Sequence, residues 1–145
     1  MKIGIHSFAS LEQPENNSAE HRHLTITNLL DRIRLSDQYG LDFYGIGEHH
    51  RQEYLDSAAH NILSAASSIT KNITLKSSVA VLSAADPVRL FQNYATLDLL
   101  SKGRVQMVVG RASFRESFPL FGLSFDDYNE LFEDCLLYTS PSPRD

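Results

Sequence analysis

Short runs of β-branched and other apolar residues alternate along this chain with longer stretches that carry apolar residues at helical spacing. The short runs, interpreted as strands, cover residues 2–5, 42–47, 73–82 and 104–110. The longer stretches, interpreted as helices, cover residues 24–40, 57–70, 85–103 and 125–134. Strands joined by helical crossovers must run parallel, so this alternation predicts a parallel sheet in an α/β fold.

Each of the first three predicted helices has an apolar stripe that we expect to face the core. The stripes are Ile26, Leu29, Leu30 and Ile33, then Ile62, Ala65, Ala66 and Ile69, then Val88, Phe91, Ala95 and Leu99. Gly40 and the pair Lys102-Gly103 predict the ends of the first and third helices. Ser57 is expected to cap the second helix, and Asp86 followed by Pro87 to begin the third.

Two architectures fit this order of elements. One is a doubly wound sheet, complete within 145 residues. The other is the N-terminal half of a (β/α)₈ barrel, a truncated form of a fold that needs about 250 residues in full. A doubly wound nucleotide binder usually carries a glycine-rich turn after its first strand, whereas residues 6–23 form a long polar segment poor in glycine. The loops therefore favour the barrel, while periodicity alone leaves both open.

The composition bounds the class of protein. The chain is 42% hydrophobic and 21% charged with a formal charge of -5, as in ordinary globular proteins. It lacks the basic stripe of a nucleic-acid binder and the run of about 20 apolar residues that crosses a bilayer, so we expect neither partner. The N-terminus lacks the apolar core of a signal peptide and the chain has a single Cys. We therefore expect a cytoplasmic protein.

The last eleven residues, CLLYTSPSPRD at 135–145, differ from the rest. They contain two prolines within three residues, and we expect the preceding helix not to continue into them. One codon reading of this segment matches a common transposon-end sequencing adapter. We therefore interpret 135–145 as a non-native tail and 1–134 as a partial barrel domain of about four β/α units. A natural flexible tail is the alternative.

Polar residues gather where each predicted strand ends. They are His6, the run Glu48-His49-His50, the pair Ser77-Ser78, and Arg111. In either architecture the site lies at the carboxyl ends of the parallel strands. Neighbouring residues on an extended chain point in opposite directions, so Glu48, His49 and His50 cannot all face one metal ion, and we expect no metal site.

A neutral imidazole at the end of a strand is suited to proton transfer near neutral pH. We therefore predict a catalytic role for His49, with Glu48 orienting it or balancing its charge. A solvated loop histidine without a function is the alternative.

The segment after the fourth strand has the residue types of a phosphate site. Gly110 permits close approach of a backbone, Arg111 can bind a phosphate, and Ser113 offers a hydroxyl. The alternative for Arg111 is an ion pair with Glu116 or another surface acid.

Three segments together resemble the bacterial-luciferase-like flavin-dependent monooxygenases. They are GEHH after the second strand, SSVAVLSAADPVRLFQNYATLDLLSKGR from the third strand to the fourth, and VVGRASFRESFPLFG after it. The resemblance covers residues 1 to 134, and the DPVR…LDLLSKGR stretch is its most specific part. That family has a (β/α)₈ barrel which binds FMN, or a deazaflavin in one branch, at its C-terminal face. The resemblance thus favours a truncated barrel.

The resemblance also implies roles for single residues. His49 matches the family's catalytic histidine, with Glu48 and His50 as its neighbours. Ser78-Val79 matches a pair joined by a cis peptide bond beneath the flavin ring, and Arg111 matches a phosphate-binding arginine.

Two further positions follow from the same resemblance. Gly110 stands where the luciferase itself carries a reactive cysteine, so the chain is similar to the wider family rather than to a light emitter. His6 is expected to line the flavin pocket.

The implied reaction uses reduced FMN and dioxygen to insert one oxygen atom into a small organic substrate such as an aldehyde. A separate flavin reductase is an implied partner, and the parent protein is expected to be a homodimer. A non-catalytic flavin-binding protein of the same group and a metal-dependent hydrolase barrel are the alternatives. The fragment alone is expected to be inactive.

Overall fold

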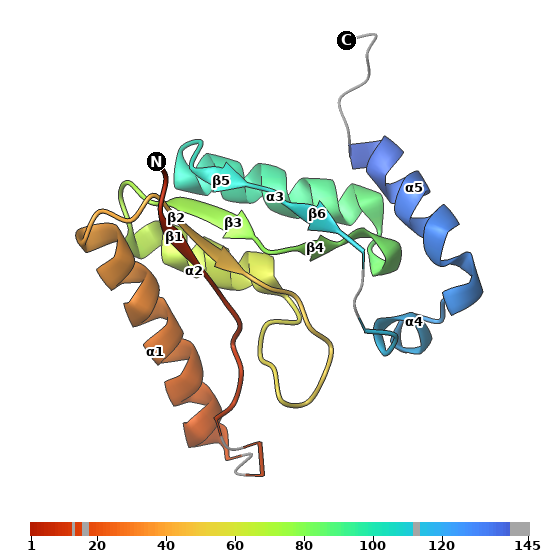
Figure 1. Ribbon diagram of the computed structural model, residues 1–145, viewed down its shortest axis with the longest axis horizontal. Helices are drawn as coiled ribbons and strands as arrows, with labels where there is room; N and C mark the ends of the chain where they lie inside the picture. Colours follow the sequence, from red (N-terminus) through yellow and green to blue (C-terminus); the bar gives the residue numbers. More distant parts are fainter. Residues whose placement is uncertain (13, 16–17, 112–113, 140–145) are drawn as a thin grey trace, which may run out of the picture.

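The computed structural model describes residues 1–12, 14–15, 18–111 and 114–139, and Figure 1 shows the path of the chain. The strands are β1 (Gly4–Ser7), β2 (Phe43–Ile46), β3 (Thr74–Ser77), β4 (Ala80–Val81), β5 (Val105–Gln106) and β6 (Val109–Gly110). The α-helices are α1 (Ala19–Gln38), α2 (Ala59–Ile69), α3 (Pro87–Ser101), α4 (Ser117–Leu120) and α5 (Tyr128–Thr139). Two 3₁₀ turns, η1 (Leu82–Ala84) and η2 (Phe125–Asp127), precede α3 and α5.

The order of the strands distinguishes the two predicted architectures. The main sheet has the order β1-β2-β3-β5, and all its strand pairs are parallel. Each strand thus lies beside the one before it, whereas a doubly wound sheet reverses its strand order at a switch point. Successive neighbours with helical crossovers are the arrangement of a barrel wall, here four β/α units of it.

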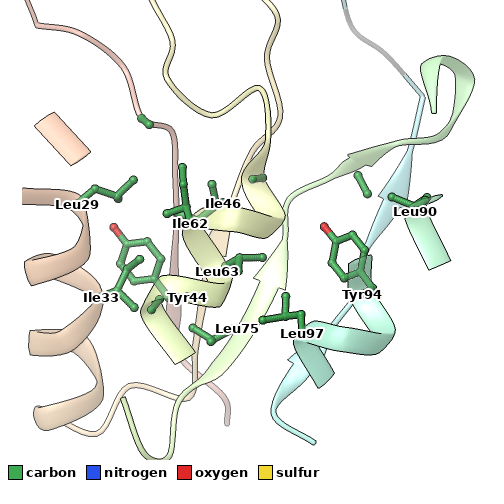
Figure 2. Packing of buried hydrophobic residues seen from close by; sticks show 14 of the residues in the cluster. Leu29, Ile33, Tyr44, Ile46, Ile62, Leu63, Leu75, Leu90, Tyr94 and Leu97 are labelled. Atoms are coloured by element: carbon green, nitrogen blue, oxygen red, sulfur yellow. The ribbon is translucent and has the colours of Figure 1, made fainter. Parts of the chain in front are cut away.

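The hydrophobic core fills the layer between the sheet and the helices (Figure 2). Tyr44, Ile46 and Leu75 point from the strands toward the helices and are fully buried. They meet apolar side chains of all three long helices, among them Leu29, Ile33, Ile62, Leu63, Leu90 and Leu97. This packing covers one face of the sheet, so the helices form a single layer on that face.

The opposite face of the sheet carries a different set of side chains. The centroid of the Phe43 ring lies 5.1 Å from that of the His6 ring, and the Lys76 ammonium lies 4.0 Å from the centroid of the Phe43 ring. These side chains are exposed or only half buried. In a closed barrel this face lines the interior, so the mixed polar and aromatic character fits a surface that the remaining strands would enclose.

Several predicted helix ends are confirmed. Gly40, with φ 75°, follows the end of α1, and Lys102 at φ 59° ends α3 in the left-handed conformation. The Asp86 side chain caps α3 by accepting a hydrogen bond from the N–H of Arg89 at 2.7 Å. Helix α1 begins earlier than predicted, because Ser18 caps it at Ala19.

Two predictions about the second helix are wrong, one of them only in part. Ser57 is not its cap, because α2 begins at Ala59 after Ala58 with no capping side chain. In its predicted stripe Ile62 and Ala66 are buried, but Ala65 and Ile69 are exposed, and Leu63 is fully buried instead. The stripe is therefore only partly as predicted.

The predicted core face of α3 is also wrong. Phe91 and Leu99 are 60% and 81% exposed, whereas Leu90, Tyr94 and Leu97 are buried. The helix has apolar residues on two faces, and the sequence pattern did not distinguish them. The outward face, with Val88 half exposed beside Phe91, stays uncovered.

The third and fourth predicted strands are each interrupted. The peptide bond between Ser78 and Val79 is cis, as the family resemblance implies, and it separates β3 from β4. Opposite this break the Ser77 hydroxyl donates to the carbonyl of Val108 at 2.8 Å and accepts from its N–H at 2.7 Å. The Ser77 side chain thus supplements the backbone bond from the N–H of Ala80 to the Val108 carbonyl, at the point between β5 and β6.

The last helix extends beyond its predicted end. Helix α5 runs from Tyr128 to Thr139, so five residues of the segment 135–145 continue it. Cys135 is buried in the core, and Leu136 packs against it. The helix continues because these residues extend its apolar face, while both prolines lie further on, at 141 and 143. Within the described ranges, no helix combines the length and apolar character needed to span a bilayer.

Candidate active site

The loops that follow β1 and β2 pair with each other above the sheet. Ser10 and Tyr54 form an antiparallel bridge. Two backbone hydrogen bonds, each of 2.8 Å, flank this bridge. The N–H of Leu55 donates to the carbonyl of Ala9, and the N–H of Leu11 donates to the carbonyl of Glu53. This pairing fixes residues 9–11 against 53–55 at the carboxyl end of the strands.

His49 is held within this paired region. Its Nδ1 lies 3.1 Å from Oδ1 of Asp56, whose second oxygen accepts the N–H of Ala9 at 2.9 Å. The imidazole stacks on Tyr54 with ring centroids 4.4 Å apart and meets the ring of Phe8 at 4.5 Å and an interplanar angle of 76°. The ring therefore has a carboxyl group on one edge and an aromatic ring stacked on one face.

Asp56 is fully buried. Burial raises the pKa of its carboxyl group, and the hydrogen bond from Ala9 and the proximity of His49 oppose that increase. A buried carboxyl group needs hydrogen-bond partners, and here the backbone N–H of Ala9 and Nδ1 of His49 lie within hydrogen-bond distance of its two oxygens.

Glu48 and His50 form a separate pair. Nε2 of His50 lies 3.1 Å from Oε1 of Glu48, and the second oxygen of Glu48 accepts the N–H of Val81 at 3.2 Å. The sequence predicted that Glu48 orients His49 or balances its charge, but in the structure Glu48 contacts His50 and ties the β2 loop to β4. The orienting contact to His49 comes from Asp56 instead.

The adjacent histidines turn to different carboxylates, and across the described residues no group of three His, Cys, Asp or Glu side chains converges.

Arg111 follows β6 and lies over the aromatic side chains of α5. Its guanidinium carbon is 4.5 Å from the Phe132 ring centroid and 5.9 Å from that of Tyr128. Glu116, the alternative partner considered from the sequence, pairs with Nε of Arg51 at 3.0 Å. Among the described residues no carboxylate lies within ion-pair distance of Arg111.

Gly110 has a steric role at this point. A Cβ atom on it would lie 2.7 Å from Cγ2 of Val79, which is too close for any side chain. Glycine at position 110 therefore leaves the space that the side chain of Val79 occupies.

A cavity of about 140 Å³ brings most of the predicted site residues together. Its lining comprises Phe8, Glu48, His49, Ser78, Val79, Val81, Arg111 and Phe114. A smaller neighbouring cavity is lined in part by His50, Glu116 and Ser117.

Two predicted residues lie elsewhere. His6 lines a separate, larger cavity of about 420 Å³ between the β1 loop and α1, which reaches none of the other predicted residues. Ser113 lies outside the described residues. The larger cavity lies along the open edge of the sheet, so the candidate site is the cavity of about 140 Å³.

Sequence reasoning missed the residues that surround His49. Asp56, Tyr54 and Phe8 contact it directly, and Phe114 lies 5.9 Å away, centroid to centroid. The sequence gives no local signal for Asp56, because the pairing of two loops brings it to the imidazole.

Taken together, the fold is four consecutive β/α units of a parallel barrel, with an imidazole and a guanidinium at the carboxyl ends of its strands. The model of the luciferase-like monooxygenase family matches residues 1–140, and the chain belongs to this family. The chain is 30% identical over 138 residues to the alkanal monooxygenase alpha chain of Photorhabdus luminescens, covering 92% of this chain and 36% of that relative.

Solved structures agree with this assignment. The chain matches the monooxygenase RslO1 from Streptomyces bottropensis with a TM-score of 0.84 at 25% identity, over 96% of this chain and 42% of that one. It matches the oxygenating constituent of 3,6-diketocamphane monooxygenase from Pseudomonas putida, solved with FMN, with a TM-score of 0.83 at 21% identity, over 96% and 38%. The second likeness concerns the fold alone.

The predicted truncated barrel and the family resemblance are thus confirmed. The chain spans about a third of the length of the curated relatives it matches, 32% and 36% for two of them.

Proposed function

We propose that the complete gene product is a flavin-dependent monooxygenase that uses reduced FMN and dioxygen to oxygenate a small organic, aldehyde-like substrate. The observation that carries this proposal is that His49, after β2, and Arg111, after β6, line one cavity at the carboxyl ends of the strands. A deazaflavin is the alternative cofactor, and a separate flavin reductase is the proposed source of reduced flavin.

The residues around the cavity fit such a cofactor in their chemistry. Arg111 offers the forked donors that match a phosphate, and Val79, Phe8 and Phe114 give an apolar wall suited to a ring system. The cavity volume of about 140 Å³ is below the roughly 300–1,000 Å³ of typical ligand pockets. This chain would therefore supply one part of the pocket, and the strands that close the barrel would supply the rest.

Each residue of this cavity has a proposed task. Arg111 would bind the phosphate, while Ser78 and Val79 would support the ring. Bound reduced FMN supplies the reaction with dioxygen, which the protein alone does not perform. His49 would accept or hold a proton at Nε2 beside the ring, and the aromatic side chains Phe8 and Phe114 would keep bulk water away from it.

Three further residues are proposed to support this cavity. Glu48 and His50 would hold the β2 loop in place through the contact to Val81. Gly110 would let Val79 take its position. His6, on the interior face of the sheet, would line the pocket only once the barrel is closed.

Replacing His49 tests the proposal. We expect His49→Ala in the complete gene product to preserve FMN binding and to reduce substrate-coupled oxygen consumption about 10²- to 10⁴-fold, the usual contribution of a general acid or base. Unchanged turnover would remove His49 from the mechanism. FMN binding without substrate-coupled turnover in the unmodified protein would instead favour the second candidate, a non-catalytic flavin-binding protein. Metal analysis of the purified protein would test the third, a hydrolase barrel.

We also propose a homodimer, a cytoplasmic location and a non-native tail. The uncovered apolar face of α3 supports the dimer. The adapter-like codon reading of residues 135–145 supports the tail, and a genomic sequence that continues through the same eleven residues would refute it.

The fragment of 145 residues is proposed to be inactive alone. Its edge strands β1 and β5 each have a neighbour on one side only, and such edges promote aggregation. Soluble fragment that binds FMN with roughly micromolar affinity would contradict this proposal.

A further inference from the structure

We propose that Asp56 is a positioning residue that keeps the proton of the neutral His49 imidazole on Nδ1 and leaves Nε2 as the proton acceptor at the cavity. The inference rests on the proposed function of His49 and adds the group through which its orientation is set. Asp56 does not line the cavity, so it would act through the imidazole alone.

The hydrogen bonds of Asp56 fix which atom faces His49. Its Oδ2 accepts the Ala9 N–H at 2.9 Å, so Oδ1 is the atom that lies 3.1 Å from Nδ1 of His49. A carboxylate has no proton to donate, so Nδ1 must donate in this contact. In a neutral ring the proton on Nδ1 leaves Nε2 unprotonated, which is the state that a general base needs.

The surroundings hold the imidazole plane in place. Tyr54 stacks on the ring at an interplanar angle of 27°, and Phe8 meets it at 76°. The side chain of His49 is 12% exposed, and that of Asp56 is fully buried. A ring flip would break the contact to Asp56 and leave a buried carboxylate without its side-chain donor, which is costly.

Asp56 also couples the loops after β1 and β2. It joins the backbone of Ala9 to the side chain of His49, next to the Ser10–Tyr54 bridge. The competing arrangement places a proton on Asp56 itself, as burial favours, and makes Nδ1 the acceptor. The two arrangements predict opposite tautomers of His49, so they are distinguishable by measurement.

The substitution Asp56→Asn is the sharpest test, because asparagine has nearly the same shape. The Ala9 N–H needs an acceptor, so the amide oxygen is expected to take the place of Oδ2. The amide NH₂ then faces Nδ1 of His49 and can only donate, which forces the proton onto Nε2. One isosteric change thus reverses the tautomer without removing the imidazole.

The experiment uses the complete gene product labelled with ¹⁵N-histidine. Imidazole ¹⁵N shifts report the tautomer of His49, fluorescence quenching reports FMN affinity, and oxygen consumption with substrate reports turnover. We expect Nδ1–H in the unmodified protein and Nε2–H in Asp56→Asn, with FMN affinity changed less than about twofold. Turnover is expected to fall about 10²- to 10⁴-fold, as when a general base is lost.

Glu53→Gln is the matched control, because Glu53 lies in the same loop with a half-exposed side chain and contacts neither His49 nor the cavity. It is expected to change none of the three readouts. Nδ1 unprotonated in the unmodified protein overturns the inference, even if Asp56→Asn fails to fold. A reversed tautomer with unchanged turnover also overturns it. Protonated Nδ1 in a protein that binds no FMN would support the Asp56 contact while refuting the proposed function.

Discussion

The hydroxyl of Ser77 bonds both backbone polar groups of Val108, accepting from its N–H at 2.7 Å and donating to its carbonyl at 2.8 Å. Ser77 is fully buried at the end of β3, where backbone pairing with the next strand is interrupted. The Ser77 side chain thereby provides hydrogen bonds to the backbone of Val108 where the strands of the sheet are interrupted, directly beneath the candidate site.

We expect Ser77→Ala to lower the free energy of unfolding by about 1–3 kcal/mol, because it leaves the partly buried N–H of Val108 without its acceptor, whereas the Val108 carbonyl keeps the N–H of Ala80. Urea denaturation of the complete gene product measures the change. Ser68→Ala is the control, since Ser68 is exposed and bonds only the helix carbonyl of Ala65. Equal stability of the two variants would show that water replaces the Ser77 hydroxyl without loss.

Asp37 predicts a pH dependence of stability. Its carboxylate accepts the N–H groups of Lys71, Asn72 and Ile73 at 2.7–2.8 Å. Burial by itself would raise the pKa of Asp37, but these three hydrogen bonds and Arg104 lower it below the ordinary value of 3.8.

A lowered pKa means that Asp37 stabilises the fold above its unfolded-state value and loses this contribution as pH falls through the folded-state value. The free energy of unfolding of Asp37→Asn should therefore be lower than that of the unmodified protein, most of all near neutral pH. This difference should shrink below about pH 4. Denaturation at a series of pH values checks this. A difference that stays constant down to the acid limit would contradict it. Asp31→Asn, on the exposed side of α1, is the control.

Gly110 predicts a steric effect with a specific rescue. Gly110→Ala places a Cβ 2.7 Å from Cγ2 of Val79, so we expect a loss of about 1–3 kcal/mol in stability, as for other overpacked sites. Adding Val79→Ala should restore most of it, because the clashing methyl group is then absent. Thermal unfolding of the two single variants and the double variant measures these changes in stability. If the losses of the two single variants add up in the double variant, a direct contact between the two side chains is excluded.

The outward face of α3 predicts the oligomeric state. Phe91 is 60% exposed and Leu99 81% exposed on a helix whose other face is buried. We expect Phe91→Glu with Leu99→Glu to convert a dimer of the complete gene product into monomers in sedimentation experiments. Tyr39→Glu, an equally exposed apolar position at the end of α1, should leave the dimer intact. A dimer that survives both substitutions on α3 would place the interface elsewhere.

The order and type of the four main strands and the four long helices followed from the sequence, because hydrophobic spacing and helix caps are local signals. Asp86 with Pro87 and the pair Lys102-Gly103 mark both ends of α3 in the pattern and in the structure. The buried face of that helix did not follow, because Leu90 and Phe91 are adjacent apolar residues of which only Leu90 meets the sheet. Tertiary packing decides between them.

In the candidate site, too, some residues could be predicted from local sequence features and others depend on tertiary contacts. Strand ends are local features, so His49 and Arg111 were predicted from their positions, and both line the cavity. Asp56 was missed because its contact with His49 depends on the pairing of two loops that are distant in sequence. His6 was grouped with the others because it also ends a strand, but it lies on the edge strand and faces a different cavity.

Binding of FMN by the complete gene product tests the central claim most directly. Fluorescence titration with oxidised FMN, and anaerobic titration with reduced FMN, should give saturable binding with a dissociation constant of roughly 1 µM or below. Arg111→Met should weaken that binding at least about tenfold, the loss expected from a charged hydrogen-bond donor, and Arg89→Met, on the exposed surface of α3, should not. A protein that binds FMN in neither redox state, or binds it equally well without Arg111, would contradict the account.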